Sequence, residues 1–161
     1  GTIHPSTISA PIVGMAYGAY AAHVEHQGKR VRAAFAGEKS KEDPFAKIRI
    51  AEAASDIDAA WRQLSGNLQA EYDLILGGEE IPMELRLAAR RDQVRATGRA
   101  IAAIDSLFEN SGAGALNNDS PIQRFWRDAH AGRVHAANDP ERAYVAFGNG
   151  EFGIPVGDTM V

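Results

Sequence analysis

Residues 50–75 have the sequence IAEAASDIDAAWRQLSGNLQAEYDLI, in which apolar side chains recur at steps of three and four. This spacing puts them on one face of an α-helix, which packs that face against other elements. The apolar positions are Ile50, Ala53, Ala54, Ile57, Trp61, Leu64, Leu68, Tyr72 and Ile75. Asp43, followed by proline, supplies an N-cap, and the glycine pair at 77–78 supplies a stop. We therefore predict a helix of about 50 Å, with Trp61 in the core, so that Trp61→Ala costs about 3 to 5 kcal/mol.

The same helical spacing recurs along the rest of the chain. The fourth expected helix opens with Ser120, Pro121 and Gln123, which fit a capping box with proline at the first position. No run of strict alternation indicates a half-buried strand. The expected helices cover about residues 7–36 with a stop at Gly37, 44–76, 82–108, 121 onward, and 140–147. The predicted fold is all-α, an antiparallel four-helix bundle.

The composition excludes several classes of partner. With 17 Lys and Arg against 21 Asp and Glu, the net charge is −4, so the chain lacks the basic surface that favours nucleic acid or an anionic membrane. It has no cysteine, which removes disulfides and thiolate metal sites and agrees with a reducing, cytoplasmic location. The apolar run at residues 8–22 is shorter than the roughly 20 residues of a membrane span. We expect one domain, a piece of something longer, whose partners are proteins or small molecules.

Four of the five histidines form two pairs in the sequence. His23 and His26 would share a helix face, whereas His130 and His135 lie about 140° apart around a helix. A metal site in a helical bundle needs Glu-x-x-His motifs with further glutamates on facing helices, and neither pair has them. A polar helix face is the preferred interpretation, and no metal site is predicted.

Two further features could bind an anion. The glycine-rich SGAGA at 111–115 could cradle a phosphate with backbone N–H groups, or form a plain turn. Arg30 and Arg32 could hold an anion, or complement the dipole at the end of the first helix. Taken singly, the turn and the dipole are the preferred interpretations.

Small side chains line one face of the fourth expected helix. Phe125, Ala129, Gly132 and Ala136 follow one another at steps of four, three and four. Either another helix or a flat ligand can approach such a face closely. His135 stands at the end of this helix, where a neutral imidazole beside a ligand can act as an acid or a base.

The order of motifs in the second half of the chain resembles the acyl-CoA dehydrogenase family. The Gly-rich loop is followed by a proline, an arginine, an aromatic residue and RDA at 127–129, as the family's GGxG loop is followed by P…R…RDA. RAAFAG at 32–37 is similar to the family's RxxFG motif, which reaches the flavin of a neighbouring subunit. The resemblance implies that residues 1–161 form the C-terminal helical domain, without the N-terminal helical and β domains.

The end of the fourth helix departs from the dehydrogenase pattern. Many acyl-CoA dehydrogenases have an aromatic residue followed by Glu-Gly-Thr there, and the glutamate removes the substrate's α-proton. Here His135 is followed by Ala136, which cannot act as a base. A histidine in this place is similar to the oxygenase components of two-component, flavin-dependent aromatic hydroxylases. FWRDAHAGRVHAANDPERAYVAFGNGEFG, residues 125–153, particularly resembles those that hydroxylate a phenolic secosteroid in bacterial steroid degradation.

This resemblance implies an activity and its partners. Reduced flavin, FMN or FAD, comes from a separate NADH-dependent reductase and reacts with O2 to give a C4a-hydroperoxide, which hydroxylates the phenol next to its hydroxyl. The oxygenase is expected to be a homotetramer, and the isolated chain is expected to bind flavin poorly. The alternatives are an acyl-CoA dehydrogenase or oxidase with a displaced base, and a non-catalytic assembly module.

The resemblance also implies roles for individual residues. His135 is the expected catalytic residue and contacts flavin or substrate, with Ala136 beside it. Arg30 or Arg32, together with the backbone of Ala113 and Gly114, is expected to hold the phosphate end of a neighbouring subunit's flavin. His130 should matter less, because it lies on another side of the helix.

Overall fold

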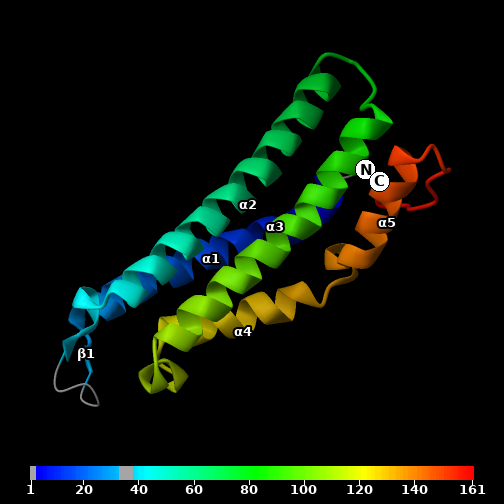
Figure 1. Cartoon of the computed structure of the whole chain (residues 1–161). Helices are drawn as coiled ribbons and strands as arrows, with labels where there is room; N and C mark the ends of the chain where they lie inside the picture. Colours follow the sequence, from blue (N-terminus) through cyan, green and yellow to red (C-terminus); the bar gives the residue numbers. More distant parts are fainter. Residues whose placement is uncertain (1–2, 33–37) are drawn as a thin grey trace.

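The computed structural model describes residues 3–32 and 38–161, and Figure 1 shows an elongated bundle of helices. Its α-helices are α1 (Ile3–Lys29), α2 (Pro44–Leu76), α3 (Met83–Asn110), α4 (Pro121–Arg133) and α5 (Pro140–Glu151). Short 3-10 helices, η2 (Ser40–Glu42), η3 (Ala113–Leu116) and η4 (Ala136–Asn138), connect them. Within these described residues, none of the helices has the length and apolar character needed to cross a bilayer.

The bundle has four legs packed side by side, which are α1, α2, α3 and the consecutive pair α4 and α5. α1 contacts α2, α3 and α4, while α3 contacts α1, α2, α4 and α5, so α1 and α3 form the centre. The fourth leg consists of α4 and α5, which run back along α3 and are separated by a break after Arg133 (Figure 1). The core between the legs is rich in alanine, and its larger members are Ile12, Ile57, Leu64, Ile101, Ile104 and Leu107. The predicted antiparallel, all-α four-helix bundle is confirmed.

The first helix is shorter than the sequence predicted. α1 ends at Lys29, and a two-residue strand, β1 (Val31–Arg32), pairs antiparallel with β2 (Glu38–Lys39). The expectation of a helix to about residue 36 and of no strand is therefore wrong at this point. Gly28 weakens the last turn, and the carbonyl of Arg30 accepts a backbone bond from Ser40 N–H at 3.1 Å instead of a helical one. The predicted stop at Gly37 lies outside the described residues.

The apolar stripe of α2 is only partly buried. Leu64 is 2% exposed, whereas Trp61 is 47% exposed and Tyr72 and Ile75 are about half exposed. The placement of Trp61 in the core is wrong. The line of α2 that faces α1 and α3 includes Ala60, one position before Trp61, and successive residues on a helix point about 100° apart.

The helix starts differ in how they are capped. Asp43 caps α2 as predicted, since its Oδ1 accepts a hydrogen bond from Phe45 N–H at 2.9 Å. Ser120 is the N-cap of α4, but its side chain makes no capping bond, so the predicted capping box does not form. Pro121 occupies the first turn of α4, where its missing N–H costs nothing.

Candidate functional site

His135 lies in the break between α4 and α5. It has extended backbone angles, φ −65° and ψ 138°, and is the N-cap of η4. Its Nδ1 accepts a hydrogen bond from Ala137 N–H at 3.1 Å, and both His135 and Ala136 are exposed. Because Nδ1 is an acceptor, the neutral ring carries its proton on Nε2. His135 therefore presents the Nε2–H donor to its surroundings, while its unprotonated Nδ1 is bonded to the backbone N–H of Ala137.

The break itself follows from the local sequence. Asp139 precedes Pro140, and the residue before a proline is pushed out of the helical region; Asp139 has φ −68° and ψ 110°. Its Oδ1 then caps α5 by accepting from Glu141 N–H at 3.0 Å. The chain leaves α4 and restarts as α5, and His135 lies in the turn between them.

A buried polar network holds this turn against α1 and α3. Asn138 is 5% exposed, and its Oδ1 lies within hydrogen-bond distance of Ser9 Oγ at 2.9 Å, Gln93 Nε2 at 3.0 Å and Thr97 Oγ1 at 3.2 Å. Its Nδ2 donates to the carbonyl of Gly132 at 3.0 Å. The turn is thus tied to the two central helices by side chains inside the core.

Arg90 extends this network. It is 1% exposed, and its Nη1 donates to the carbonyl of Ala137 at 2.7 Å and to Gln93 Oε1. Burial lowers the pKa of Arg90, while the carboxylates of Asp158 and Asp139 act in the opposite direction. The guanidinium therefore holds the backbone two residues after His135.

The small-residue face of α4 is covered by α1. Ile12 lies close to Gly132, where an added Cβ would be 3.2 Å from the Ile12 side chain. At Gly18 an added Cβ would overlap the ring of Phe125, and Ala129 is fully buried. Of the two possibilities that the sequence left open, another helix therefore occupies this face at Phe125, Ala129 and Gly132. The placement of Ala136 on the same face is wrong, because Ala136 lies beyond α4 in η4 and is exposed.

The predicted phosphate-binding residues gather where α1 meets the end of α3. Arg30 Nη1 donates to the carbonyl of Asn110 at 3.0 Å. Gly112 has φ +74°, and a Cβ there would overlap the Arg30 guanidinium, so only glycine fits. Ala113 and Gly114 follow in η3 and are exposed. The structure brings Arg30, Ala113 and Gly114 together; Arg32 lies in β1, and the placement of its side chain is outside the described part of the chain.

Two residues of α1 beside Arg30 also cap α3. Gln27 Nε2 donates to the carbonyl of Asn110 at 2.7 Å, and His26 Nε2 lies 3.1 Å from the carbonyl of Ser111. These bonds satisfy carbonyl groups that the end of a helix leaves without partners. Among the described residues, no three His, Asp or Glu side chains gather as metal ligands.

His130 has its own partners away from His135. Its Nδ1 lies 2.8 Å from the carbonyl of Trp126, and its Nε2 lies 3.3 Å from Asp105 Oδ1. Trp126 Nε1 donates to the same carboxylate at 2.8 Å. The sequence argument placed the two histidines on one helix. This placement is wrong, because His135 lies beyond the end of α4. Their separate partners still make them unequal.

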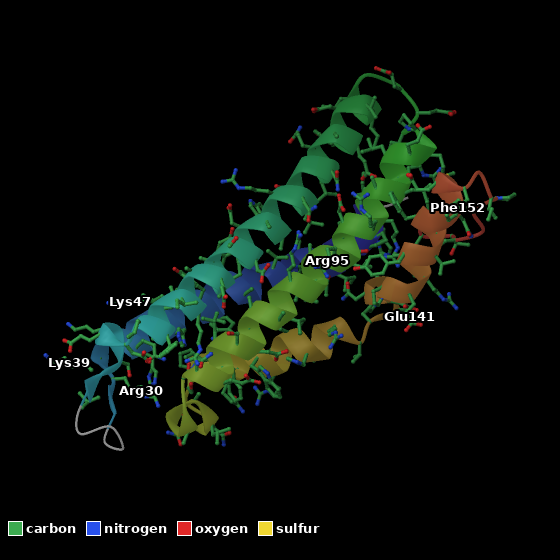
Figure 2. The ribbon with its side chains drawn as sticks, in the orientation of Figure 1. Arg30, Lys39, Lys47, Arg95, Glu141 and Phe152 are labelled. Carbon is green, nitrogen blue, oxygen red and sulfur yellow. The ribbon has the colours of Figure 1, made fainter. Side chains whose placement is uncertain are left out.

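The two groups of predicted site residues lie at opposite ends of α4. This helix has 13 residues, and each adds about 1.5 Å, so roughly 20 Å separates η3 from His135. Figure 2 shows the same arrangement, with Arg30 at one end of the bundle and Glu141, at the start of α5, beyond the far end of α4. Within one chain the structure does not bring His135 and Ala136 to Arg30.

Comparison with known families decides the classification. Residues 6–140 match the model of the acyl-CoA dehydrogenase C-terminal domain. The chain belongs to this family. Its helical bundle, with a break between α4 and α5 in the middle of the fourth leg, is thus the bundle of an acyl-CoA dehydrogenase C-terminal domain, and the resemblance found in the sequence is confirmed.

Several relatives of this acyl-CoA dehydrogenase C-terminal domain are flavin-dependent monooxygenases. The chain is 81% identical over all 161 residues to the oxygenase subunit HsaA of Rhodococcus jostii RHA1, and covers 42% of that protein. It is 82% identical to HsaA of Mycobacterium tuberculosis H37Rv and covers 41% of it. The crystal structure of 3-HSA hydroxylase from Rhodococcus sp. RHA1 superposes on the whole chain with a TM-score of 0.93 at 81% identity, again over 42% of its length. The chain therefore spans about two fifths of these relatives.

Sequence reasoning missed the residues that hold the turn of His135. Arg90, Gln93 and Thr97 are polar residues at steps of three and four on α3, between buried Ala89, Ala96 and Ala100. Polar side chains that interrupt an alanine-rich helix face at this spacing are the available signal, because a buried polar group requires a partner.

Proposed function

We propose that residues 1–161 form the C-terminal helical domain of the oxygenase subunit of a two-component, flavin-dependent monooxygenase. Its substrate would be 3-hydroxy-9,10-secoandrosta-1,3,5(10)-triene-9,17-dione, hydroxylated ortho to the phenol in bacterial steroid and cholesterol degradation. The observation that carries the proposal is the identity of 81% to 82% with HsaA subunits over the full 161 residues. The name oxygenase subunit also supports a separate reductase as partner.

His135 would contribute a hydrogen-bond donor to this reaction. The bound reduced flavin supplies the activation of O2 for transfer to the aromatic ring. Loss of the phenol proton raises the electron density of the carbon ortho to the oxygen, and a donor to the resulting phenolate stabilises that charge. The exposed Nε2–H of His135 is such a donor, while its Nδ1 is occupied by Ala137 N–H. We infer that His135 stabilises the phenolate oxygen and that the proton leaves to another acceptor.

Arg30 would hold a phosphate group of the flavin. The Arg30 guanidinium lies against the Gly112 turn, next to the exposed backbone of Ala113 and Gly114. A guanidinium beside exposed glycine-rich backbone fits a phosphate, because both supply N–H donors. The roughly 20 Å between this cluster and His135 supports a flavin shared between neighbouring subunits, as a homotetramer would allow. The lack of cysteine fits a reducing cytoplasm.

The proposed function is tested with the intact oxygenase subunit. Chemically reduced flavin, O2 and the phenolic secosteroid are supplied, and the catechol is measured by mass spectrometry. Catechol formation is the expected result. Reduction of oxidised flavin by an acyl-CoA, without catechol, would instead identify a dehydrogenase with a displaced base. If neither reaction occurs, the assembly-module alternative replaces the proposal.

The role of His135 predicts an uncoupled variant. His135→Ala removes the donor to the phenolate, so the yield of catechol per NADH should fall roughly tenfold or more while hydrogen peroxide release rises. Both products are measured in the same reaction with the reductase present. His130→Ala is the control, because His130 contacts Trp126 and Asp105 rather than the turn, and it should change the yield much less. Unchanged coupling in His135→Ala would remove His135 from the chemistry.

A further inference from the structure

The amide of Asn138 sits where the turn of His135 meets the core. Ser9, Gln93 and Thr97, the three side chains around its oxygen, are each at most 2% exposed. Gln93 Nε2 also donates to Ser9 Oγ, so the Ser9 hydroxyl has its proton free for Asn138 Oδ1. The Ser9 hydroxyl and the Gln93 amide are therefore both donors to the Asn138 oxygen, which is the acceptor at the end of this network.

The other side of the same amide faces the end of α4. Asn138 Nδ2 donates to the carbonyl of Gly132, and Asn138 N–H donates to the carbonyl of His135 at 2.8 Å. An oxygen at the Nδ2 position would face a carbonyl oxygen, so the orientation of the amide is determined by its partners. Asn138 thus joins α1, α3 and the last turn of α4 at the residues that bracket His135.

The bonds around Ala137 transmit this placement to the imidazole. The Ala137 carbonyl accepts from Arg90 at 2.7 Å and from Gln93 at 3.2 Å, and the Ala137 N–H donates to His135 Nδ1. As long as this backbone is fixed, the N–H points at Nδ1 and the ring proton stays on Nε2. If the turn moves, Nδ1 loses its donor and the ring can rotate or change tautomer.

We propose that Asn138 is a positioning residue, which fixes the turn at Ala137 and thereby the orientation and the Nε2–H tautomer of His135. The inference rests on the proposed role of His135 as a donor. Asn138 does not touch the substrate: it is buried and acts through the backbone. An acceptor and a donor on one short side chain are both required, and asparagine supplies them.

The test uses Asn138→Ala and Asn138→Asp. Asn138→Ala removes all the bonds of the amide, while Asn138→Asp keeps an acceptor for Ser9 and loses the donor to Gly132. The chain is labelled with 15N at its five histidines, and the His135 signal is identified as the one lost in His135→Gln. In the parent the Nδ1 shift should be that of an unprotonated nitrogen, and both variants should show mixed tautomers. Exchange of the Ala137 amide hydrogen should be at least about tenfold faster, because its bond to Nδ1 opens.

Leu64→Ala is the matched control, because it destabilises the bundle at α2, away from the turn. Each variant is studied at a temperature equally far below its own Tm. Leu64→Ala should keep the parent tautomer and the slow exchange of Ala137, whereas Asn138→Ala should not. If Asn138→Ala keeps both, or if Leu64→Ala loses both, the inference is wrong.

A second readout connects the turn to the chemistry. In the intact oxygenase, Asn138→Ala should lower the catechol yield per NADH by roughly tenfold, with more hydrogen peroxide and with the KM for the phenol less affected than kcat. Leu64→Ala should keep the parent yield. A parent oxygenase that makes no catechol would overturn the proposed function, while the 15N spectra would still decide the inference about Asn138.

Discussion

His23 is a buried histidine that cannot easily become charged. It is 1% exposed, and burial, followed by the nearby His26, lowers its pKa from 6.5 to about 4. The Ser111 hydroxyl donates to the carbonyl of Leu107 at 2.8 Å, so its oxygen accepts from His23 Nδ1–H, also at 2.8 Å. His23 is thus a neutral residue that supports the turn beside Arg30.

This burial makes the stability of the chain depend on pH. The pKa of His23 is lower in the folded state than in the unfolded state, so below pH 6.5 the unfolded state binds more protons and stability falls until about pH 4. Between pH 7 and pH 5 the loss should be about 2 kcal/mol. It is measured as the change in unfolding free energy in urea, relative to His23→Asn, whose amide can still donate to Ser111. A difference that stays constant between the two pH values would show that His23 is not held neutral.

At the level of single residues, the sequence suggested candidate side chains, and the structure shows only where they lie and what they contact. Motif order suggested His135 and Arg30 as candidates, because the residues of a motif are adjacent in the chain, and their roles remain proposals. It could not identify Asn138 or Arg90, because their partners come from helices distant in sequence. The tautomer of His135 depends on one hydrogen bond, from the Ala137 N–H to Nδ1, which forms only once η4 has formed.

Among the elements, α2 shows how far helical periodicity can predict packing. Spacing by three and four identified the helix and its ends at Asp43 and Gly77, because capping and periodicity are local properties. It did not tell which part of a wide apolar face meets α1 and α3. The loss of helix after Lys29 was also missed, because the pairing of β1 with β2 competes with the helix there.

A pair of substitutions in α2 measures this difference. Leu64→Ala should lower the unfolding free energy by about 2 to 4 kcal/mol, because it leaves a cavity among buried side chains. Trp61→Ala should cost the isolated chain less than about 1.5 kcal/mol, because nearly half of that side chain already contacts water. Urea unfolding of both variants gives the comparison. A loss of 3 kcal/mol or more in unfolding free energy for Trp61→Ala would show that Trp61 is a core residue after all.

For the whole molecule, the separation of Arg30 from His135 favours a flavin site that is shared between two subunits. Both are proposed to serve one flavin, yet α4 keeps them roughly 20 Å apart in a single chain. A symmetric pair of subunits can solve this by giving each site a His135 from one chain and an Arg30 from the other. One chain would then hold the flavin ring, and its neighbour would hold the phosphate end.

Mixed assemblies of two inactive variants test this arrangement. Arg30→Met and His135→Gln are each expected to lower catechol formation in the intact oxygenase, the first by weakening flavin binding and the second by removing the donor. When the two variant subunits are assembled together, one site of each mixed pair has both parent residues, so about half of the sites in such a pair should recover. The controls are each variant alone at the same total concentration and a mixture kept from exchanging subunits. If Arg30 and His135 of one chain served the same site, every site in the mixture would contain a substitution, and catechol formation would not rise above the mean of the two separate variants.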